Sequence, residues 1–324
     1  MAKLKTIAVI TPGGDAPGMN TAIRAVVRTA IFHDLKVCGI EQGWWGLMHG
    51  HMREMEAKDV GGIINRGGTI LHSRRCPEFK KKSNRKLAYK NLESSGIDGI
   101  VAIGGDGSMR ASQIIMKETG LPINVIPATI DNDIPGTDYT IGFDTAVNTA
   151  VEAIDKIRDT ATSHERLFVV EVMGRHNGFI ALDVAMVAGA EACIIPEVKF
   201  NLNTIVKQIE DGHERGKKSF IIVMAEGAAD SRKIVAQLEK KIKNIGVRLT
   251  ILGHMQRGGV PTALSRELAC KLGATAVELM INGGGGYLVG AISDKICCTP
   301  ISKLAKTKKQ IDLEQLRIAN MLAT

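Results

Sequence analysis

The stretch GIVAIGGDGS (residues 99–108) joins an unbroken apolar run to a turn in which glycines flank one aspartate. An apolar run without polar alternation is typical of a parallel strand that helices cover on both faces. In the turn, free backbone N–H groups can bind phosphate, and the carboxylate of Asp106 can hold Mg²⁺ that bridges phosphates. The stretch therefore predicts a buried strand that ends in a phosphate-binding turn.

Short β-branched runs alternate with longer helical patterns along the rest of the chain. This alternation predicts an α/β fold with mainly parallel sheets flanked by helices. Ligands bind beyond the carboxyl ends of the strands in such sheets, so the turns that follow strands are candidates for the functional site. Strands are expected at residues 6–10, 99–103, 123–126, 167–172, 192–195, 219–224, 249–252 and 290–293, and helices at residues 19–32, 84–94, 144–160, 202–214, 231–243 and 265–281.

The length and composition indicate a globular protein of about two domains. The chain has 324 residues, of which 44% are hydrophobic and 23% charged, and domains usually contain about 100–200 residues. No run of about 18 apolar residues predicts a membrane span. The apolar run near the N-terminus leads directly into glycines, so we expect a first strand there and not a signal peptide. The six cysteines lack CxxC or zinc-site spacing, which indicates reduced thiols and a cytoplasmic protein.

The formal net charge of +8 is compatible with nucleic acid binding or with a protein that holds several phosphates. The basic runs at residues 80–82 and 303–309 contain no interleaved aromatic side chains for base stacking. We therefore interpret both runs as solvated surface and expect neither nucleic acid nor a membrane among the partners.

A second glycine cluster, TPGGDAPGMN (residues 11–20), follows the first expected strand and opens the first expected helix. Gly13 and Gly14 allow the backbone to approach a ligand closely, and the N-terminus of a helix favours an anion. The cluster lacks the GKS of a P-loop and the GxGxxG of a dinucleotide-binding turn. By itself it is as compatible with a tight turn as with a phosphate site.

The third candidate is TIDND (residues 129–133), which comes soon after the expected strand at residues 123–126. Phosphoryl transfer to an alcohol needs a carboxylate that accepts the hydroxyl proton and positions the oxygen. Asp131 is our candidate for this base, and Asp133 could orient its neighbours or reach a metal through water. The alternative for both carboxylates is an Asx-turn that caps the next segment.

Arginines and histidines also cluster near expected strand ends and turns. Arginine binds phosphate through two parallel hydrogen bonds, which suits an anionic substrate. Any one of these residues would more often be an ordinary surface residue, but their coincidence with two glycine–aspartate turns favours a phosphate-bearing substrate. They lie at residues 74–79, 164–166, 173–178 and 253–259 and at Arg248.

Taken together, the motifs resemble those of the bacterial ATP-dependent 6-phosphofructokinase family. The resemblance covers nearly the whole chain and is weakest after about residue 299, and TIDND with MGR and GHMQRGG is highly specific as a set. It implies two Rossmann-like lobes, a larger one that binds ATP (residues 1–141 and 254–304) and a smaller one that binds fructose 6-phosphate (residues 142–253 and 305–324). The motifs GGDAPGMN, INRGGT, PEF, IGGDGS, TIDND, GTDYTIGFDTA, EAIDKIRDT, VVEVMGR, PEV and LGHMQRGG occur in the family's order and approximate spacing.

The resemblance also implies roles for individual residues, with ATP as co-substrate and Mg²⁺ on Asp106. It places Asp131 as the base at the 1-hydroxyl of the sugar and Arg75 where it offsets charge on the transferred group. The catalytic set would be Thr129, Asp131, Arg75 and Arg175, and the ATP contacts would be Gly14, Arg75, Cys76, Gly105, Asp106, Gly107 and Ser108.

A further set would hold fructose 6-phosphate. Two of its members, Arg166 and Arg248, would reach in from a neighbouring subunit, because the family is a homotetramer that builds its active sites across an interface. The set consists of Thr129, Ile130, Asp131, Arg166, Met173, Gly174, Arg175, Glu226, Arg248, His254, Met255, Gln256 and Arg257.

Two positions distinguish the donor. The family's diphosphate-using branch typically has Asp in place of Gly107 and Lys in place of Ala128, and this chain has neither, which favours ATP. Ala128 nevertheless departs from the Gly that is usual in the ATP branch. A diphosphate-dependent enzyme, a GGDG kinase that acts on a lipid or dinucleotide, and a regulatory paralogue without catalysis are the rival readings.

The family also has an effector site for nucleotides such as ADP. The family's usual Arg is replaced here by Ala57, with Lys58 as the nearest cation, and residues 61–62 are glycines where a polar pair is common. We therefore expect weaker or altered activation. The matching positions are Arg24, Ala25, Val26, Val27, Arg28, Arg158, Gly189, Ala190, Glu191, Arg215, Lys217, Lys218 and Ser219.

Overall fold

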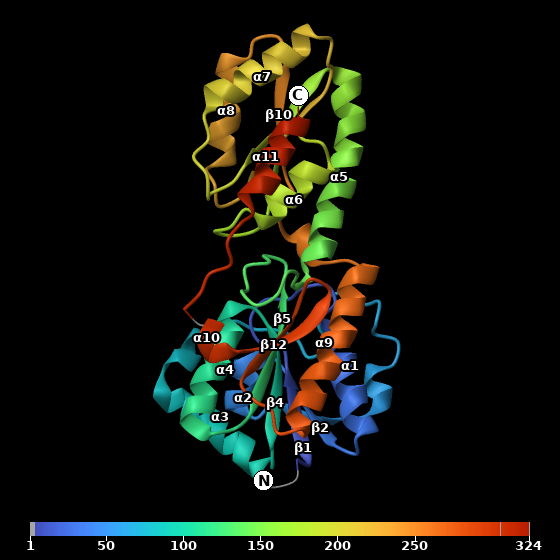
Figure 1. Cartoon of the computed structure of the whole chain (residues 1–324), viewed down its shortest axis with the longest axis vertical. Coiled ribbons are helices and arrows are strands. Elements are labelled where there is room, and N and C mark those ends of the chain that lie inside the picture. The colour runs from blue at the N-terminus through green and yellow to red at the C-terminus, as the bar shows by residue number, and fades with distance from the viewer. Residues whose placement is uncertain (1–3, 305, 324) are drawn as a thin grey trace. The chain divides into compact units, whose positions relative to one another are not determined.

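The computed structural model describes residues 4–304 and 306–323, which form two compact units (Figure 1). The first unit comprises Met1–Thr145 and Arg257–Lys309, and the second comprises Ala146–Gln256 and Gln310–Thr324. These boundaries fall a few residues after those expected at 141, 253 and 304. Residues 1–3, 305 and 324 of the expected domain ranges lie outside the described part of the chain.

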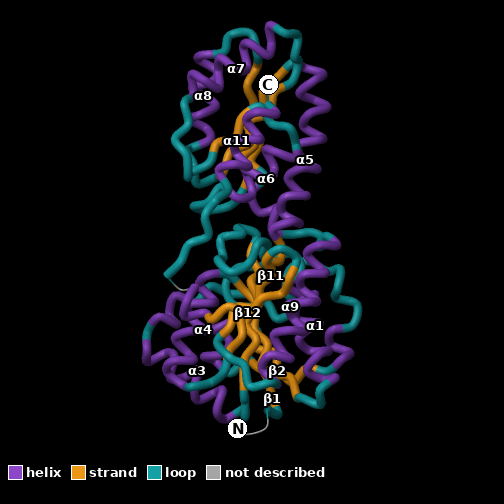
Figure 2. Tube along the Cα trace, viewed as in Figure 1, coloured by secondary structure: helices purple, strands orange, loops and turns teal. Residues whose placement is uncertain are grey.

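The first unit is built on a mainly parallel sheet, whose described strands follow the order β12-β11-β5-β4-β1-β2-β3, with β6 beside β5 (Figure 2). Among these described strands, only the pairs at the two edges, β2–β3 and β11–β12, are antiparallel. The parallel centre needs a crossover between successive strands, which the helices of the unit supply. The strands are β1 (Thr6–Ile10), β2 (Lys36–Ile40), β3 (Met52–Met55), β4 (Gly99–Gly104), β5 (Ile123–Thr129), β6 (Ile141–Gly142), β11 (Tyr287–Ile292) and β12 (Lys295–Pro300).

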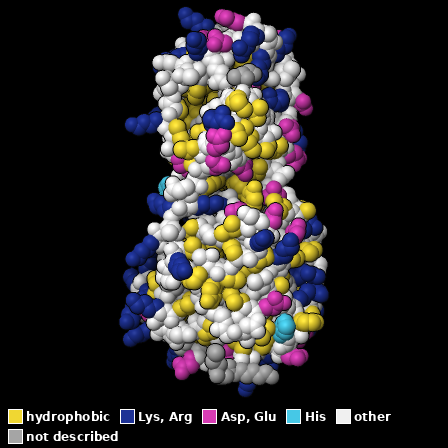
Figure 3. Space-filling view, viewed as in Figure 1, with side chains coloured by type: hydrophobic (Ala, Val, Ile, Leu, Met, Phe, Trp, Pro, Cys, Tyr) yellow, Lys and Arg dark blue, Asp and Glu magenta, His cyan; other side chains and the backbone are white. Residues whose placement is uncertain are grey.

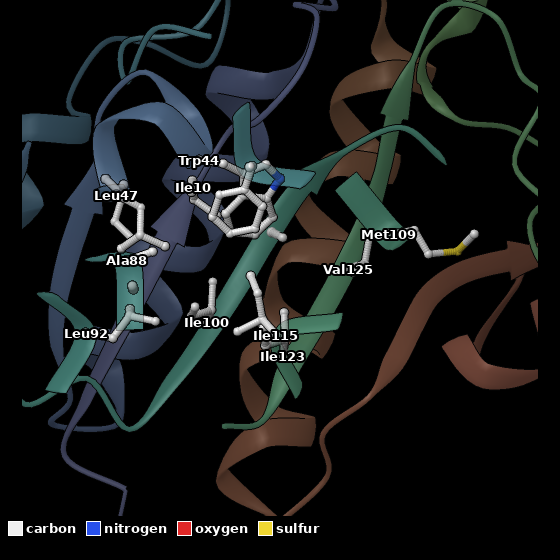
Figure 4. Packing of buried hydrophobic residues seen from close by; sticks show 14 of the residues in the cluster. Ile10, Trp44, Leu47, Ala88, Leu92, Ile100, Met109, Ile115, Ile123 and Val125 are labelled. Atoms are coloured by element: carbon white, nitrogen blue, oxygen red, sulfur yellow. The ribbon is translucent and has the colours of Figure 1, made fainter. Parts of the chain in front are cut away.

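Helices cover both faces of this sheet, which explains the unbroken apolar runs. The helices α2 (Gly43–His49), α3 (Lys82–Ser94) and α4 (Asp106–Thr119) pack on one face, where Figure 4 shows Trp44, Leu92 and Ile115 against β1, β4 and β5. On the other face lie α1 (Met19–Phe32) and α9 (Ala263–Ile281). These two pack so closely that a Cβ at Gly273 would lie 2.5 Å from the Cβ of Ala25.

The second unit has a four-stranded, all-parallel sheet of order β10-β7-β9-β8. Its core includes buried side chains of α7 and α8 on one face, such as Ile209 and Leu238. The helices α6 and α11 contact each other and β8, and Gln315 Nε2 of α11 donates a hydrogen bond to Asp183 of α6 (2.6 Å). The elements are α5 (Phe143–His164), β7 (Arg166–Val172), α6 (Phe179–Val187), β8 (Ala192–Ile194), α7 (Leu202–Glu214), β9 (Phe220–Ala225), α8 (Ser231–Lys241), β10 (Gly246–Ile251) and α11 (Leu313–Leu322).

The predicted α/β fold with mainly parallel sheets is confirmed, and every expected strand and helix is present with its ends shifted by a few residues. The elements that the sequence did not predict include β2, β3, β12 and α11. Two of these, β3 and β12, are edge strands with exposed or polar positions, for which an unbroken apolar run is not required, and β2 begins with the exposed Lys36. None of the described helices is long and apolar enough to cross a membrane.

An ion pair outside the sheet anchors the segment that precedes α3. Arg85 is 7% exposed and binds Glu118 through two hydrogen bonds, from Nε (2.9 Å) and Nη2 (2.7 Å). Its Nη1 donates to the carbonyl oxygens of Phe79 (3.2 Å) and Lys80 (2.7 Å). The Arg85 guanidinium, and secondarily the Tyr89 hydroxyl, lower the pKa of Glu118 to about 2 from its ordinary 4.5. The pair therefore holds the short helix η2 (Pro77–Lys80) against α4.

This ion pair predicts a specific pH dependence of stability. Because the pKa of Glu118 is lower in the folded protein than in the unfolded one, its contribution is fully present above about pH 4.5 and is lost as the pH falls toward 2. We expect Glu118→Gln to lower the urea midpoint at pH 7 and the difference from the parent to shrink as the pH falls from 5 to 3.

The matched control is Glu152→Gln. Glu152 pairs with Lys156 on an exposed helix face (2.6 Å; 71% and 73% exposed), where ion pairs contribute little. Its urea midpoint should stay near that of the parent at every pH. A Glu118→Gln difference that is the same at pH 7 and pH 3 would contradict the prediction.

Candidate active site

The turns that follow β1 and β4 lie at a point where the strand order reverses. β1 pairs with β2 on one side and with β4 on the other. The helix that follows β1, α1, covers one face of the sheet, whereas the helix that follows β4, α4, covers the other (Figure 1). Loops that diverge in this way leave a crevice beyond the strand ends, which is the usual ligand site of open α/β sheets. The two glycine clusters found in the sequence meet at this point.

A buried hydroxyl links the two turns. Ser108 is 4% exposed, and its Oγ donates a hydrogen bond to the carbonyl oxygen of Pro12 (2.9 Å). Gly104 leaves the space for this contact, because a Cβ there would lie 2.8 Å from the same carbonyl oxygen and would collide with Ser108. Gly104 is therefore required by packing.

Gly107 has no such packing reason. A Cβ at this position would meet no atom within 4 Å, and its backbone is not left-handed. The residue lies in the first turn of α4, whose N-cap Gly105 makes no side-chain capping hydrogen bond. A helix N-terminus with accessible N–H groups suits an anion, and a glycine that the fold does not need leaves room for one to approach. This turn fits the phosphates of a nucleotide.

Asp106 lies at the first position of α4 and pairs with Arg110 one helical turn later (Nε to Oδ2, 2.8 Å). Both side chains are well exposed, at 39% and 58%. The described residues contain no group of three or more His, Cys, Asp or Glu that could hold a metal by themselves. Mg²⁺ is usually held by one or two carboxylates together with phosphates and water. A single exposed carboxylate beside the glycine turn fits that mode of binding.

The segment that carries Arg75 and Cys76 is anchored to the end of β1. Thr11 is fully buried, and its Oγ1 donates to the carbonyl oxygen of His72 (2.8 Å). The Arg74 guanidinium lies over the ring of Trp45 at 4.1 Å. Arg75 is exposed, and partial burial raises the pKa of the Cys76 thiol. The predicted ATP contacts therefore lie in the segment that packs beside the first glycine turn.

The TIDND segment continues from β5, the strand next to β4. Asp131 is 2% exposed, and its N–H donates to Thr129 Oγ1 (3.3 Å). A Cβ at Gly105 would lie 3.6 Å from the Cβ of Thr129, so the two strand-end turns are in contact. The side chain of Ile130 is fully buried, which leaves only its backbone for the expected substrate contact.

In the second unit, the turn after β7 holds Met173, Gly174 and Arg175. Arg175 has a left-handed backbone (φ 53°), which is unusual for its residue type. Glu226, which follows β9, accepts hydrogen bonds from the N–H groups of Gly174 (3.2 Å) and Arg175 (2.8 Å). The fully buried Gln256 accepts one from the N–H of Met173 (2.8 Å). Glu226 and Gln256 therefore hold the backbone of the turn at residues 173–175, and all five are predicted site residues.

The other predicted site residues of the GHMQRGG motif belong to different units. His254 and Met255 are exposed in the short helix η3 (Gly253–Arg257). Arg257 belongs to the first unit and donates from Nη1 to the carbonyl oxygen of Asp15 (3.0 Å), with the Asp15 carboxylate 3.6 Å away. The structure thus places Arg257 beside the first glycine turn and Gly14, a pairing with Asp15 that the sequence analysis did not identify.

Arg166 and Arg248 lie at the other end of the second sheet. Arg166 opens β7, whereas Met173 follows the end of the same seven-residue strand, and a strand of that length spans roughly 20 Å. Arg248 pairs in register with Phe168, near the same starting end. Within one chain, these two arginines therefore do not join the turn at Met173.

The expected effector residues of the second unit also gather at this starting end of the strands. Arg158 Nη2 donates to the carbonyl oxygens of Ala188 (2.6 Å) and Gly189 (3.0 Å). Lys217 pairs with the buried Glu191 (2.7 Å), and Lys218 pairs with Glu165 (2.9 Å). Ala190 is buried, and Arg215 and Ser219 lie in the segment that leads into β9. In the first unit, Arg24 and Arg28 are accessible on α1, whereas Ala25, Val26 and Val27 are buried in the core.

Comparison with known proteins gives consistent results. Residues 6–280 match the family model of phosphofructokinase. The ATP-dependent 6-phosphofructokinase of Bacillus cytotoxicus is 50% identical over 320 residues, which cover 99% of this chain and all of that protein. The enzyme of the same name from Bacillus subtilis is 49% identical with the same coverage. The crystal structure of Pichia pastoris phosphofructokinase in the T-state superposes with a TM-score of 0.89 at 36% identity, over 94% of this chain and 36% of that one, so the chain spans about a third of its length.

Proposed function

This chain belongs to the phosphofructokinase family, and we propose that it transfers the γ-phosphoryl group of ATP to the 1-hydroxyl of fructose 6-phosphate. The observation that carries the proposal is the contact between the TIDND segment and the glycine–aspartate turn, through Thr129 and Gly105. This contact brings a buried carboxylate, Asp131, to the strand end beside a turn that suits phosphates. The curated relatives at about 50% identity, whose names specify ATP, favour the same reaction.

In the proposed mechanism, Asp131 accepts the proton of the sugar 1-hydroxyl as the phosphoryl group is transferred. Thr129 orients the backbone of Asp131, because its Oγ1 accepts a hydrogen bond from the N–H of Asp131. The backbone N–H groups of Gly105 and Gly107 bind the phosphates of ATP, and the exposed guanidinium of Arg75 offsets charge on the transferred group. Asp106 would hold Mg²⁺, which neutralises part of the phosphate charge when it is bound.

The second unit would supply the contacts to fructose 6-phosphate. The left-handed turn at Gly174 and Arg175 presents backbone and guanidinium together, and Glu226 and Gln256 hold it in this conformation. His254 is exposed in η3 and available to a phosphate. Arg257 would contribute to the same substrate from its position beside Asp15.

The glycine at 107 supports ATP as the donor. A side chain there would project into space that the protein leaves open, where it would meet the bound phosphates and not the fold. An Asp would add a negative charge at this place and repel the inner phosphate of ATP. Ala128 is 1% exposed in β5, so its methyl group is directed into packed surroundings. The lack of Asp at 107 and of Lys at 128 favours ATP over diphosphate, whereas the buried methyl group of Ala128 does not distinguish the two donors.

The face that Figure 3 shows gives no support to nucleic acid binding. On the face that Figure 3 shows, Lys and Arg side chains occur in several separate groups, and acidic side chains lie among many of them. A nucleic acid would need a continuous basic stripe. The intact Asp106 and Asp131 argue against a regulatory paralogue. We propose a cytoplasmic, glycolytic role for the enzyme.

The donor and the base can be tested in one assay. Fructose 1,6-bisphosphate formation is measured with Mg²⁺ and fructose 6-phosphate, and with either ATP or diphosphate. We expect turnover with ATP alone, and a loss of about 10²- to 10⁴-fold in kcat for Asp131→Asn, because the amide cannot accept the proton.

Asp133→Asn is the matched control, since it removes a neighbouring carboxylate of the same segment and should lose less activity. Turnover with diphosphate would mean that Gly107 and Ala128 do not select the donor. No turnover with either donor would favour the regulatory reading, and an equal loss in both variants would leave the base unassigned to Asp131.

We further propose that each active site takes Arg166 and Arg248 from a neighbouring subunit of a homotetramer. The support is geometric, because Arg166 opens β7 and Arg248 lies opposite Phe168, five residues before Met173, while the Met173 turn follows the other end of β7. Within a single chain, neither arginine would contribute to the site at the Met173 turn. In a closed symmetric oligomer, the same surface of every subunit meets its neighbour in the same way.

Subunit complementation tests this arrangement. Arg166→Ala and Asp131→Asn should each be nearly inactive alone, because each lacks one component of every site. When the two are unfolded together and reassembled, random mixing should restore about a quarter of the sites, since some then combine an intact Asp131 with a partner's intact Arg166. Activity that stays at the level of the separate variants would contradict shared sites. Each variant reassembled alone is the control.

We propose that nucleotide activation is weak, because the effector cations have partners within the protein. Ala57 supplies no charge, and the neighbouring Lys58 is engaged with Glu56 (2.7 Å), which raises its pKa. Arg158 and Lys217 also have protein partners. A nucleotide phosphate would have to displace these contacts.

An ADP titration at low fructose 6-phosphate measures this effect. We expect a small response in the parent and a larger one in Ala57→Arg, which adds a guanidinium at an exposed position of η1 (Ala57–Val60). Ala57→Gln is the control for side-chain length without charge. Strong activation of the parent by ADP would show that other cations compensate for Ala57.

A further inference from the structure

The residue that follows the proposed base has an unusual backbone and a buried side chain. Asn132 has φ 52°, in the left-handed region, and is 4% exposed. Asparagine tolerates this conformation better than most residues. A residue in this conformation reverses the chain direction immediately after Asp131, so the position of the carboxylate depends on how firmly residue 132 is held.

Both ends of the Asn132 amide are hydrogen-bonded across the loop that follows. Oδ1 accepts from the N–H of Thr140 (3.0 Å), and Nδ2 donates to the carbonyl oxygen of Asp138 (3.1 Å). The hydroxyl of Thr140 in turn donates to the carbonyl oxygen of Thr129 (2.6 Å). Residues on both sides of Asp131 are therefore tied to the returning strand of the loop.

The far side of the loop is itself anchored to the sheet. The Asp138 carboxylate accepts from the N–H of Ser293 (2.7 Å), directly after β11, and its own N–H donates to the carbonyl oxygen of Ala291 (2.8 Å). Its carbonyl oxygen also accepts from Lys309 Nζ (2.6 Å). Asn132 thus connects Asp131 to a segment that β11 holds in place.

We propose that Asn132 is a positioning residue for the phosphoryl transfer, which sets the location of the Asp131 carboxylate through its two hydrogen bonds to the 138–140 segment. This inference rests on the proposed function of Asp131. Its effect should appear in kcat, because a base displaced by about 1 Å can lose about 10²-fold in rate while substrate binding is retained.

The test compares Asn132 with Asn124, a second buried asparagine earlier in the same part of the chain. Asn132→Gly removes both hydrogen bonds but keeps a residue that adopts a positive φ without strain. Asn124→Ala is the matched control. Asn124 is fully buried near the start of β5, away from the strand end, and its amide bonds the carbonyl oxygen of Ala276 (3.0 Å) and the N–H of Tyr287 (3.3 Å).

We expect Asn132→Gly to lose about tenfold to hundredfold in kcat with KM for both substrates changed less than about threefold. Amide hydrogen exchange in a peptide that spans Thr140 should also become faster, and this readout does not depend on activity. Asn124→Ala should lower Tm while keeping the kcat of the parent and the exchange rate at Thr140.

The outcomes distinguish the proposed function of the protein from the positioning role of Asn132. An inactive parent with Mg-ATP and fructose 6-phosphate would overturn the proposed function. An active parent with an Asn132→Gly variant of equal kcat would overturn the positioning role alone, as would a loss of kcat that Asn124→Ala shares.

If Asn132→Gly does not fold, Asn132→Asp takes its place. It keeps the acceptor for Thr140 and loses only the donor to Asp138, and a carboxylate next to Asp131 should shift the acidic limb of the kcat–pH profile to higher pH. A folded Asn132→Asp with the kcat and pH profile of the parent would contradict the proposal.

Discussion

The parallel pairing of β1, β4 and β5 is the constraint on which the site depends. Ile10 lies opposite Ala102 of β4, and Gly104 lies opposite Pro127 of β5. Because parallel strands end at the same edge of a sheet, this register brings three separate turns together. The reversal of strand order at β1 then opens the space beyond that edge, since the following helices leave in opposite directions. A one-residue change in register would shift the end of each strand relative to its neighbour, so the three turns would no longer meet.

Polar side chains hold these turns in shape, and three of them, Ser108, Asn132 and Gln256, are buried. Ser108 joins the β1 and β4 turns, Asn132 closes the loop after β5, and Glu226 and Gln256 hold the turn after β7. Backbone N–H and C=O groups at strand ends have no ladder partner, and burial without one is costly. A side chain that satisfies such a group therefore selects one conformation of the turn. The candidate site residues therefore lie in turns whose backbone is fixed by these hydrogen bonds.

The cationic side chains of the second unit are divided between the two ends of its strands. The carboxyl ends of the second sheet carry the Met173 turn, and the starting ends carry Arg166, Arg248, Arg158 and Lys217. An α/β lobe has two chemically different edges, and only the carboxyl edge presents the N-termini of the following helices. Cations at the other edge therefore lie away from the Met173 turn of the same chain.

The sequence by itself determined the fold class, the central strands and the turns that carry the reactive groups. Unbroken apolar runs report burial on both faces, and glycines beside aspartate report a backbone that must approach a ligand, so both are visible locally. The sequence could not show why each glycine is present. Gly104 is required by packing, whereas a Cβ at Gly107 would meet no atom within 4 Å, and only the structure distinguishes the two.

The tertiary structure alone decided which side chains hold others in place. Asn132 pairs with residues six and eight positions away, Arg257 with Asp15, and Glu226 with a turn after a different strand. Their residue types are unremarkable in the sequence because one hydrogen bond between distant segments leaves no periodic pattern. Such contacts depend on the crossovers that bring strand ends together, and those exist only once the sheet is assembled.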